Sequence, residues 1–342
     1  MTMAGKAFRS GSVVLALVAT FAIGGCGDAS ESGGSGDADA GSAMPSFEPL
    51  TSDGGGGAPD GEPPTDTDAG PTGGPDDNIV GGTDVDIAEF PWVVALRVSG
   101  KKGDNFCGGA LIGEGAVMTA AHCVTLDAEG GGYNVLPPSV IEVVLGRSVL
   151  SDESGGQVVQ VAKVWTAKDF KRKGLANDYA VLSLASDVTT PPIALPAPSQ
   201  TDLWTVGQET LTLGWGCEFG PPAGPECGER PGDSPLKGAL LAMQNRNVCT
   251  QEFGSLDASH LCMKSTTESA GICQGDSGGP FVVYDDGKPF LVGVTSFNAL
   301  NGECNSSIPQ GAAFVPRVTT AEHWLVDGIW NVCEGTKACP HA

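Results

Sequence analysis

Residues 275–280 read Gly-Asp-Ser-Gly-Gly-Pro, and this hexapeptide decides how the whole chain is interpreted. Three glycines around one serine predict a tight loop whose backbone N–H groups face a ligand, because glycine lets the backbone turn sharply and approach closely. A hexapeptide of this kind is very rare by chance. Ser277 at its centre is therefore a candidate nucleophile.

A serine hydroxyl is a weak nucleophile at neutral pH and needs an adjacent base. The segment Thr119-Ala-Ala-His122-Cys123 supplies a candidate base, and Asn177-Asp178-Tyr-Ala-Val-Leu182 supplies a carboxylate that could orient it. Taken alone, a histidine is usually structural, and an aspartate beside a strand is usually a turn residue. The chain has four histidines, and we expect the other three to be structural: His260, His323 and His341.

Short apolar runs, punctuated by Gly, Pro, Asn and Asp, fill the chain from Ile79 onward and predict an all-β barrel or sandwich. A helix is expected only near the C-terminus, where Thr319-Thr-Ala-Glu322 is a capping-box pattern and apolar residues then recur at helical spacing. The expected strands are 92–98, 116–119, 140–145, 158–164, 180–184, 210–213, 281–284 and 290–294.

The segment before Ile79 has a different composition. Residues 27–78 consist almost wholly of Gly, Asp, Ser, Pro, Thr and Ala, with twelve Asp or Glu and no Lys or Arg. Such a segment cannot bury enough apolar surface to offset the entropy of ordering, so we expect a disordered acidic tether or propeptide. The net charge of −23 argues against nucleic acid or an anionic membrane surface as a partner.

Residues 1–26 have the pattern of an export signal, with a basic start and an apolar run, 13–23, that is too short to span a bilayer. The run ends in Ile23-Gly-Gly-Cys26, which resembles the lipobox of bacterial lipoproteins, whose cysteine is lipidated. An ordinary signal peptide with an incidental cysteine is the alternative. The chain has eleven cysteines, and setting Cys26 aside leaves an even number, which favours the lipoprotein interpretation.

The three segments occur in the order and spacing of the chymotrypsin/trypsin-like serine peptidase family, which the chain resembles over residues 79–333. The fold that this resemblance implies is two antiparallel six-stranded β-barrels, with the active site in the cleft between them, followed by a C-terminal α-helix. The peptidase domain would then be residues 79–342. Further matching motifs are Ile79-Val-Gly-Gly82, Pro91-Trp92, Cys107-Gly-Gly109, Gly214-Trp-Gly216 and Ser296.

The resemblance implies a serine endopeptidase that cuts proteins or peptides without a cofactor. Ser277 would attack the scissile carbonyl, His122 would take the proton and return it to the leaving amine, and Asp178 would hold the histidine tautomer. The backbone N–H groups of Gly275 and Ser277 would form the oxyanion hole.

Ile79-Val-Gly-Gly82 resembles the activation site of the family. Cleavage before this isoleucine frees an ammonium group that pairs with the aspartate before the catalytic serine, here Asp276. The family usually has Arg or Lys before the isoleucine, whereas this chain has Asn78, and it has no Lys or Arg between Arg9 and Arg97. We therefore expect activation by a protease that is not specific for Arg or Lys, or by the enzyme itself.

The resemblance implies three disulfides, and proximity in sequence suggests two more, with cross-pairing of the last four cysteines as the alternative. Five disulfides fit an oxidising compartment. Because no cysteine lies between Cys26 and Cys107, cleavage before Ile79 would free the domain from a lipid anchor. The implied pairs are Cys107–Cys123, Cys249–Cys262 and Cys273–Cys304, and the suggested pairs are Cys217–Cys227 and Cys333–Cys339.

The residue six before the catalytic serine lies at the base of the primary pocket in the family, where a carboxylate selects Arg or Lys substrates. Here the position is Gly271, followed by Ile272, and neither can pair with a cation. The wall reads Ser296-Phe297-Asn298 where the family usually has Ser-Trp-Gly, and Ala313 aligns with another wall glycine. We expect a shortened, uncharged pocket that favours small or medium apolar side chains, with Phe297 and its neighbours pairing with the substrate backbone.

We expect no metal site, because the stretch that matches the calcium loop of the family has Arg147 near the first ligand position. We expect a monomer that is secreted or extracellular. If Cys26 is lipidated, the lipid would anchor the chain to a bacterial outer membrane until activation. The alternative function is a surface lipoprotein that stays uncleaved and only binds, but the intact triad motifs argue against it.

Overall fold

The structure is a computed structural model of the chain, and it describes residues 79, 82–99, 105–197, 199–217, 233–266, 270–298, 304 and 309–314. The expectations for the signal segment, the tether, the C-terminal helix and the Cys333–Cys339 pair fall on residues outside these ranges.

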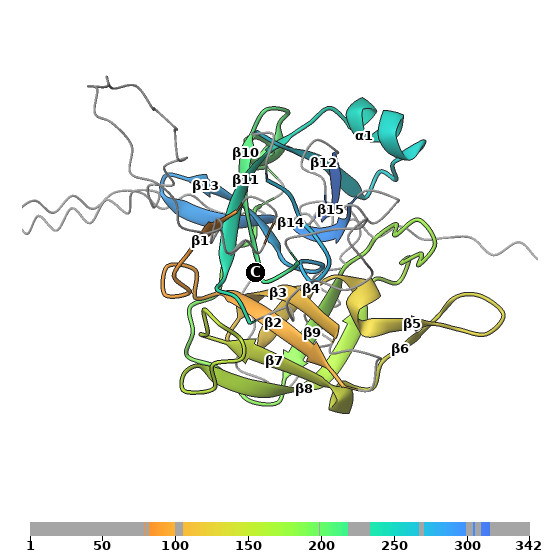
Figure 1. Cartoon of the computed structure of the whole chain (residues 1–342). Coiled ribbons are helices and arrows are strands. Elements are labelled where there is room, and N and C mark those ends of the chain that lie inside the picture. The colour runs from red at the N-terminus through yellow and green to blue at the C-terminus, as the bar shows by residue number, and fades with distance from the viewer. Residues whose placement is uncertain are drawn as a thin grey trace, which may run out of the picture. The chain divides into compact units, whose positions relative to one another are not determined.

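The first half of the described chain forms a closed antiparallel barrel (Figure 1). Each strand has residues buried in a shared apolar core that includes Trp92 and Leu182. The expected strands in this half are all present. In barrel order the strands are β2 (Val93–Val98), β3 (Asn105–Gly113), β4 (Ala116–Thr119), β9 (Ala180–Leu184), β8 (Gln157–Thr166) and β7 (Ile141–Leu145), with β7 pairing back to β2.

The second half forms a second antiparallel barrel, which the pairing of β11 with β12 closes. A short strand, β1 (Thr83–Asp84), is added outside β11. The two six-stranded barrels confirm the fold that the sequence predicts. In barrel order the strands are β11 (Lys237–Met243), β10 (Glu209–Gly214), β13 (Pro280–Asp285), β14 (Lys288–Phe297), β15 (Gln310–Phe314) and β12 (His260–Ser265).

An α-helix between β11 and β12, α1 (Arg246–Phe253), contradicts the expectation that only the C-terminus is helical. Its sequence lacks an apolar stripe, and Cys249 is its only buried residue. Local signals at its two ends define the helix instead. The Asn245 side chain caps the N-terminus by accepting a hydrogen bond from Asn247 N. Gly254, with a φ of 74°, ends the helix. The other elements are the hairpin β5 (Thr125–Asp127) and β6 (Tyr133–Val135) and three 3-10 helices, Ala121–Val124, Pro138–Val140 and Thr201–Trp204.

The two barrels meet at glycines. A Cβ on Gly108 of β3 would lie 2.7 Å from Gly279 Cα, so only glycine permits this approach. The closeness allows Gly108 N to donate a 2.7 Å hydrogen bond to Ser277 O. Thr119 Oγ1 also donates to Gly108 O, so the end of β4 and the serine loop are tied to the same residue. This contact brings the serine loop of the second barrel to the part of the first barrel that carries His122.

Candidate active site

His122 and Asp178 are neighbours because of strand pairing in the first barrel. Strand β4 ends at Thr119, which pairs with Ala180 at the start of β9. The chain continues from β4 into a 3-10 helix that carries His122, while Asp178 lies just before β9. His122 Nδ1 is 2.7 Å from Asp178 Oδ2, and His122 N donates to Asp178 Oδ1 at 2.8 Å. Two contacts to one carboxylate fix both the position and the rotation of the imidazole.

A third donor to Asp178 comes from the second barrel. Ser296 Oγ on β14 donates to Asp178 Oδ2 at 2.6 Å, and the carboxylate is 0% exposed. Burial alone would raise the pKa of Asp178, but the charge of His122 and the hydrogen bonds from His122 and Ser296 outweigh it and hold the pKa below its usual value. Asp178 is therefore ionised at neutral pH. The sequence placed Ser296 in the pocket wall and did not predict this hydrogen bond.

The disulfide Cys107–Cys123 lies between the His122 segment and the loop of Ser277. The Cys123 sulfur is 3.9 Å from His122 Nε2 and 3.6 Å from Ser277 O, so imidazole and serine loop flank one atom. Ser277 Oγ makes no hydrogen bond to His122 Nε2 in the described part of the chain. Such contacts are often long without substrate and tighten when it binds.

Two N–H groups of the serine loop make no hydrogen bond to the described residues. Gly275 has a φ of 100°, which only glycine adopts without strain. Gly278 N and Gly279 N bond to Thr295 O and Asp276 O, whereas Gly275 N and Ser277 N have no acceptor among the described residues. Two unpaired donors beside a candidate nucleophile are what an oxyanion requires.

Asp276 points away from the site into the second barrel. It is 1% exposed and accepts hydrogen bonds from Gly216 N and Cys273 N, both at 2.8 Å. A Cβ on Gly216 would lie 2.4 Å from Asp276 Cγ, so the glycine makes room for the carboxyl group. Burial raises the pKa of Asp276 to about 7, although the two backbone donors act in the opposite direction. In the described residues, no cation pairs with it.

Comparison of the chain with known proteins identifies its family. The family model described as Trypsin matches residues 79–325. The chain belongs to the trypsin family. It is 32% identical over 220 residues to a trypsin of Saccharopolyspora erythraea, covering 64% of this chain and 86% of the relative. It is 30% identical over 227 residues to trypsin-1 of Astacus astacus, covering 64% of this chain and 88% of the relative. The chain is thus a serine endopeptidase that acts on proteins.

The residues expected to line the primary pocket are uncharged, and all except the half-buried Phe297 and Asn298 are buried. Ile272 is 2% exposed, and its N–H donates to Gln310 Oε1 on β15. Asn298 Nδ2 reaches Ile272 O at 3.4 Å and the sulfur of Cys304 at 3.6 Å. The disulfide Cys273–Cys304 joins the same two segments. Asn298 therefore links the same two segments that this disulfide joins, and Gly271 next to Ile272 is buried.

The structure places Gly311, rather than Ala313, against the wall residue Phe297. A Cβ on Gly311 would lie 2.2 Å from Phe297 Cζ, so the phenyl ring covers this glycine. Ala313 pairs with Val294 and His260 and is buried in the core. In the register of β14 and β15, Gly311 is the partner of Phe297 and Ala313 is the partner of Val294.

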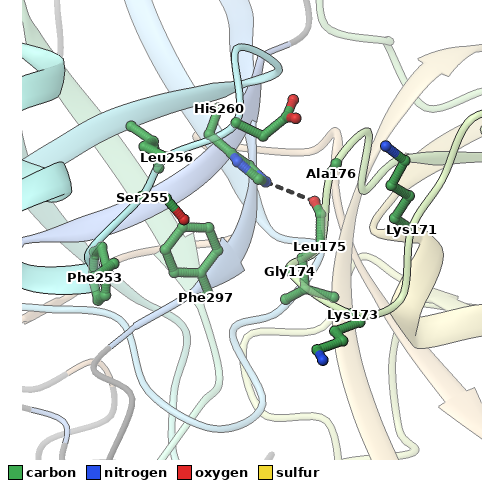
Figure 2. A pocket seen from close by; sticks show the side chains of 11 residues that line it. Lys171, Lys173, Gly174, Leu175, Ala176, Phe253, Ser255, Leu256, His260 and Phe297 are labelled. Atoms are coloured by element: carbon green, nitrogen blue, oxygen red, sulfur yellow. Dashed lines mark hydrogen bonds between the residues drawn. The ribbon is translucent and has the colours of Figure 1, made fainter.

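His260, expected to be structurally unremarkable, holds the loop before Asp178. It is 2% exposed on β12, and its Nε2 is 2.6 Å from Leu175 O, as the dashed line in Figure 2 shows. Its neighbour Ser259 accepts a 2.8 Å hydrogen bond from Asn177 N. Leu175 and Asn177 both have positive φ, 51° and 53°, which is strained for residues other than glycine. Two adjacent residues of the second barrel thus stabilise a strained turn of the first.

The remaining cysteines are consistent with the expected pairing where they are described. Cys249 of α1 is bonded to Cys262 of β12. Cys217 is disulfide-bonded, and its suggested partner Cys227 lies outside the described residues. The only grouping of ligand atoms close enough for a metal ion in the described ranges is Cys107, His122 and Cys123, and its two sulfurs are bonded to each other. No helix in those ranges is long and apolar enough to cross a bilayer.

Proposed function

We propose that His122, Asp178 and Ser277 are the catalytic triad of this endopeptidase. The observation that carries the proposal is the buried carboxylate of Asp178, which accepts from His122 N, His122 Nδ1 and Ser296 Oγ. An ionised Asp178 keeps the proton on Nδ1, so that Nε2 offers its lone pair to Ser277. Nε2 takes the hydroxyl proton as Ser277 Oγ attacks the scissile carbonyl, and later returns it to the leaving amine.

The negative charge that develops on the carbonyl oxygen is stabilised by Gly275 N and Ser277 N. Both donors are on the same loop as the nucleophile, so they need no rearrangement when the charge appears. Removal of one such donor typically costs about 3 kcal/mol of transition-state stabilisation. Water then attacks the acyl-enzyme by the same route and releases the second product.

The test is turnover of a peptide library by protein that begins at Ile79, beside its Ser277→Ala variant. We expect the variant to lose activity by about 10⁶-fold, the typical cost of removing the nucleophile of a triad. A fluorophosphonate probe should label Ser277 in the parent and leave the variant unlabelled. A folded protein with a free Ile79 amine that cuts no peptide would indicate that the chain only binds, as in the alternative of an uncleaved surface lipoprotein.

We propose further that the chain is made as a zymogen and activated by hydrolysis of the Asn78–Ile79 bond. The buried Asp276 supports this, since its raised pKa marks a carboxylate that lacks a cation. The Ile79 side chain is also fully buried, in the same apolar cluster of the second barrel as Ile272. Its φ of 45° is unusual for a β-branched residue and costs about 1–3 kcal/mol at Ile79. A free Ile79 ammonium would supply the missing charge.

The pocket supports a preference for small or medium apolar residues before the scissile bond. Gly271, Ile272 and Ser296 are buried, Phe297 and Asn298 are half-buried, and none of these residues carries a carboxylate. A substrate Arg or Lys would lose hydration there without gaining an ion pair. In the library, cleavage after Arg or Lys would keep the enzyme but contradict this interpretation of Gly271 and Ile272.

The place of action that fits these features is outside the cytoplasm. Three described disulfides support an oxidising compartment. If Cys26 carries a lipid, cleavage before Ile79 releases the catalytic domain, because none of the disulfides in the described ranges involves a residue before 79. Active enzyme found only in the membrane fraction would contradict this release.

A further inference from the structure

A basic cluster lies on the loop before Asp178. Residues 79–342 contain 16 Lys or Arg, and four of them fall within 168–173. Arg172 is held against the His122 segment, with Nε 2.6 Å from Asp127 Oδ1 and Nη1 donating to Thr125 O. Lys171 and Lys173 on either side are exposed, and neither has an ion-pair partner among the described residues. Two positive charges are therefore available to a ligand in a protein that is otherwise acidic.

The loop that carries the lysines is rigid. Lys171 and Ala176 form an isolated antiparallel bridge, with Lys171 N donating to Ala176 O. Arg172 fixes one side of the turn, and His260 fixes Leu175 on the other. Because these contacts define the backbone, the lysines lose little backbone entropy when a ligand binds.

The lysines face a pocket of about 600 Å³. Figure 2 shows Lys171 and Lys173 on the loop side of this pocket, with Phe253, Leu256 and Phe297 on the opposite side. Among the described lining residues the one carboxylate is Asp257, whose Oδ1 accepts hydrogen bonds from Ser259 N and Oγ. The pocket thus offers an apolar wall and a cationic rim.

The pocket adjoins the proposed site of hydrolysis. Leu175 on one wall is three residues before Asp178, and Phe297 on the other follows Ser296, which donates to Asp178. Phe297 pairs with Gly311 on one side, and its other edge has no strand among the described residues. If a substrate pairs along that edge, it advances about 3.3 Å per residue, and its residues upstream of the scissile bond pass the pocket.

We propose that Lys171 and Lys173 select acidic residues upstream of the scissile bond, and that the Pro75-Asp-Asp-Asn78 segment of a second copy of this chain is such a substrate. This rests on the proposed function. Asp76 and Asp77 are the third and second residues before the Asn78–Ile79 bond. Asn78 is uncharged, so it suits an uncharged pocket better than Arg or Lys, although less well than an apolar residue of similar size. Hydrolysis uses one water and leaves the Asn78 carboxylate and the Ile79 amine. Active enzyme therefore activates its own precursor in trans.

The test compares two peptide anilides, Pro-Asp-Asp-Asn and Pro-Ala-Ala-Asn, with enzyme that begins at Ile79. We expect kcat/KM to favour the acidic peptide by about tenfold, as two exposed charge pairs of up to ~1 kcal/mol each allow. The preference should shrink as salt rises, because exposed pairs are screened. Lys171→Glu with Lys173→Glu should reverse the ratio of kcat/KM between the two peptides. The matched control is Lys168→Glu, which alters an exposed lysine of the same cluster that does not line the pocket.

The full-length Ser277→Ala chain is the second substrate, since it cannot process itself. Catalytic amounts of active enzyme should cut it before Ile79, and the lysine-reversed enzyme should do so about tenfold more slowly. Changing Asp76 and Asp77 of that precursor to Lys should restore cleavage by the reversed enzyme. Equal rates on both peptides, or a precursor left intact, would overturn this inference and leave the endopeptidase standing. Failure to cut even the neutral peptide would overturn the proposed function as well.

Discussion

The Asp178→Asn variant should fold normally yet lose about 10⁴-fold in kcat, the typical cost of the equivalent change in a Ser-His-Asp triad. Asp178 accepts three hydrogen bonds, and all three donors are fixed by the backbone or by β14. An asparagine has one acceptor oxygen and an amide that can only donate. With the amide facing Nδ1, the His122 proton moves to Nε2, and the imidazole no longer accepts the proton of Ser277.

The matched control for this variant is Asp169→Asn. Asp169 is an exposed carboxylate nine residues earlier in the same loop, and its side chain makes no hydrogen bond with other described residues. The control should retain full activity, and circular dichroism with a denaturant titration should show both variants folded. If the Asp178→Asn protein kept more than about a tenth of the parental kcat, Asp178 would not be the residue that sets the His122 tautomer.

The sequence predicted five of the six strands of the first barrel, because these five carry strong local signals. Residues 180–184 are apolar, bounded by Asp178 before them and a turn after, and they form β9 as expected. In contrast, β3 contains the sequence Cys-Gly-Gly, which has little strand propensity. It becomes a strand because Gly108 must pass close to Gly279, which is a requirement of the tertiary structure and not of the local sequence.

The candidate site likewise combines residues that local motifs predict with contacts that only the tertiary structure shows. Motifs give the identity of His122, Asp178 and Ser277, since each has a distinctive local sequence. The contacts that hold them come from partners far along the chain: Ser296 is 118 residues from Asp178, and His260 is 85 residues from Leu175. The local sequence around Ser296 or His260 does not predict a hydrogen bond to the loop that carries Asp178. The burial of His260 would have predicted a hydrogen-bond partner for its ring, but this burial is visible only in the structure.

Stability of the uncleaved chain should fall as pH rises from about 4 to about 7, because of Asp276. Its pKa is raised to about 7 by burial, from 3.8. Between these values the unfolded chain has lost the proton while the folded chain retains it, so the folded state binds more protons and the free energy of unfolding decreases with pH. At 1.36 kcal/mol per pKa unit, the loss is complete above pH 7 and amounts to about 4 kcal/mol.

The measurement is urea unfolding of the full-length Ser277→Ala chain at pH 5 and pH 8, beside the same chain with Asp276→Asn. The pKa of His260 is lowered by burial, and its effect in this window has the opposite sign, so the difference between the two chains isolates Asp276. We expect the chain with Asp276 to lose about 3 kcal/mol more than its Asn variant. Cleavage before Ile79 should abolish that difference, because the new ammonium stabilises the ionised carboxylate. An equal loss before and after cleavage would show that the Ile79 amine does not reach Asp276.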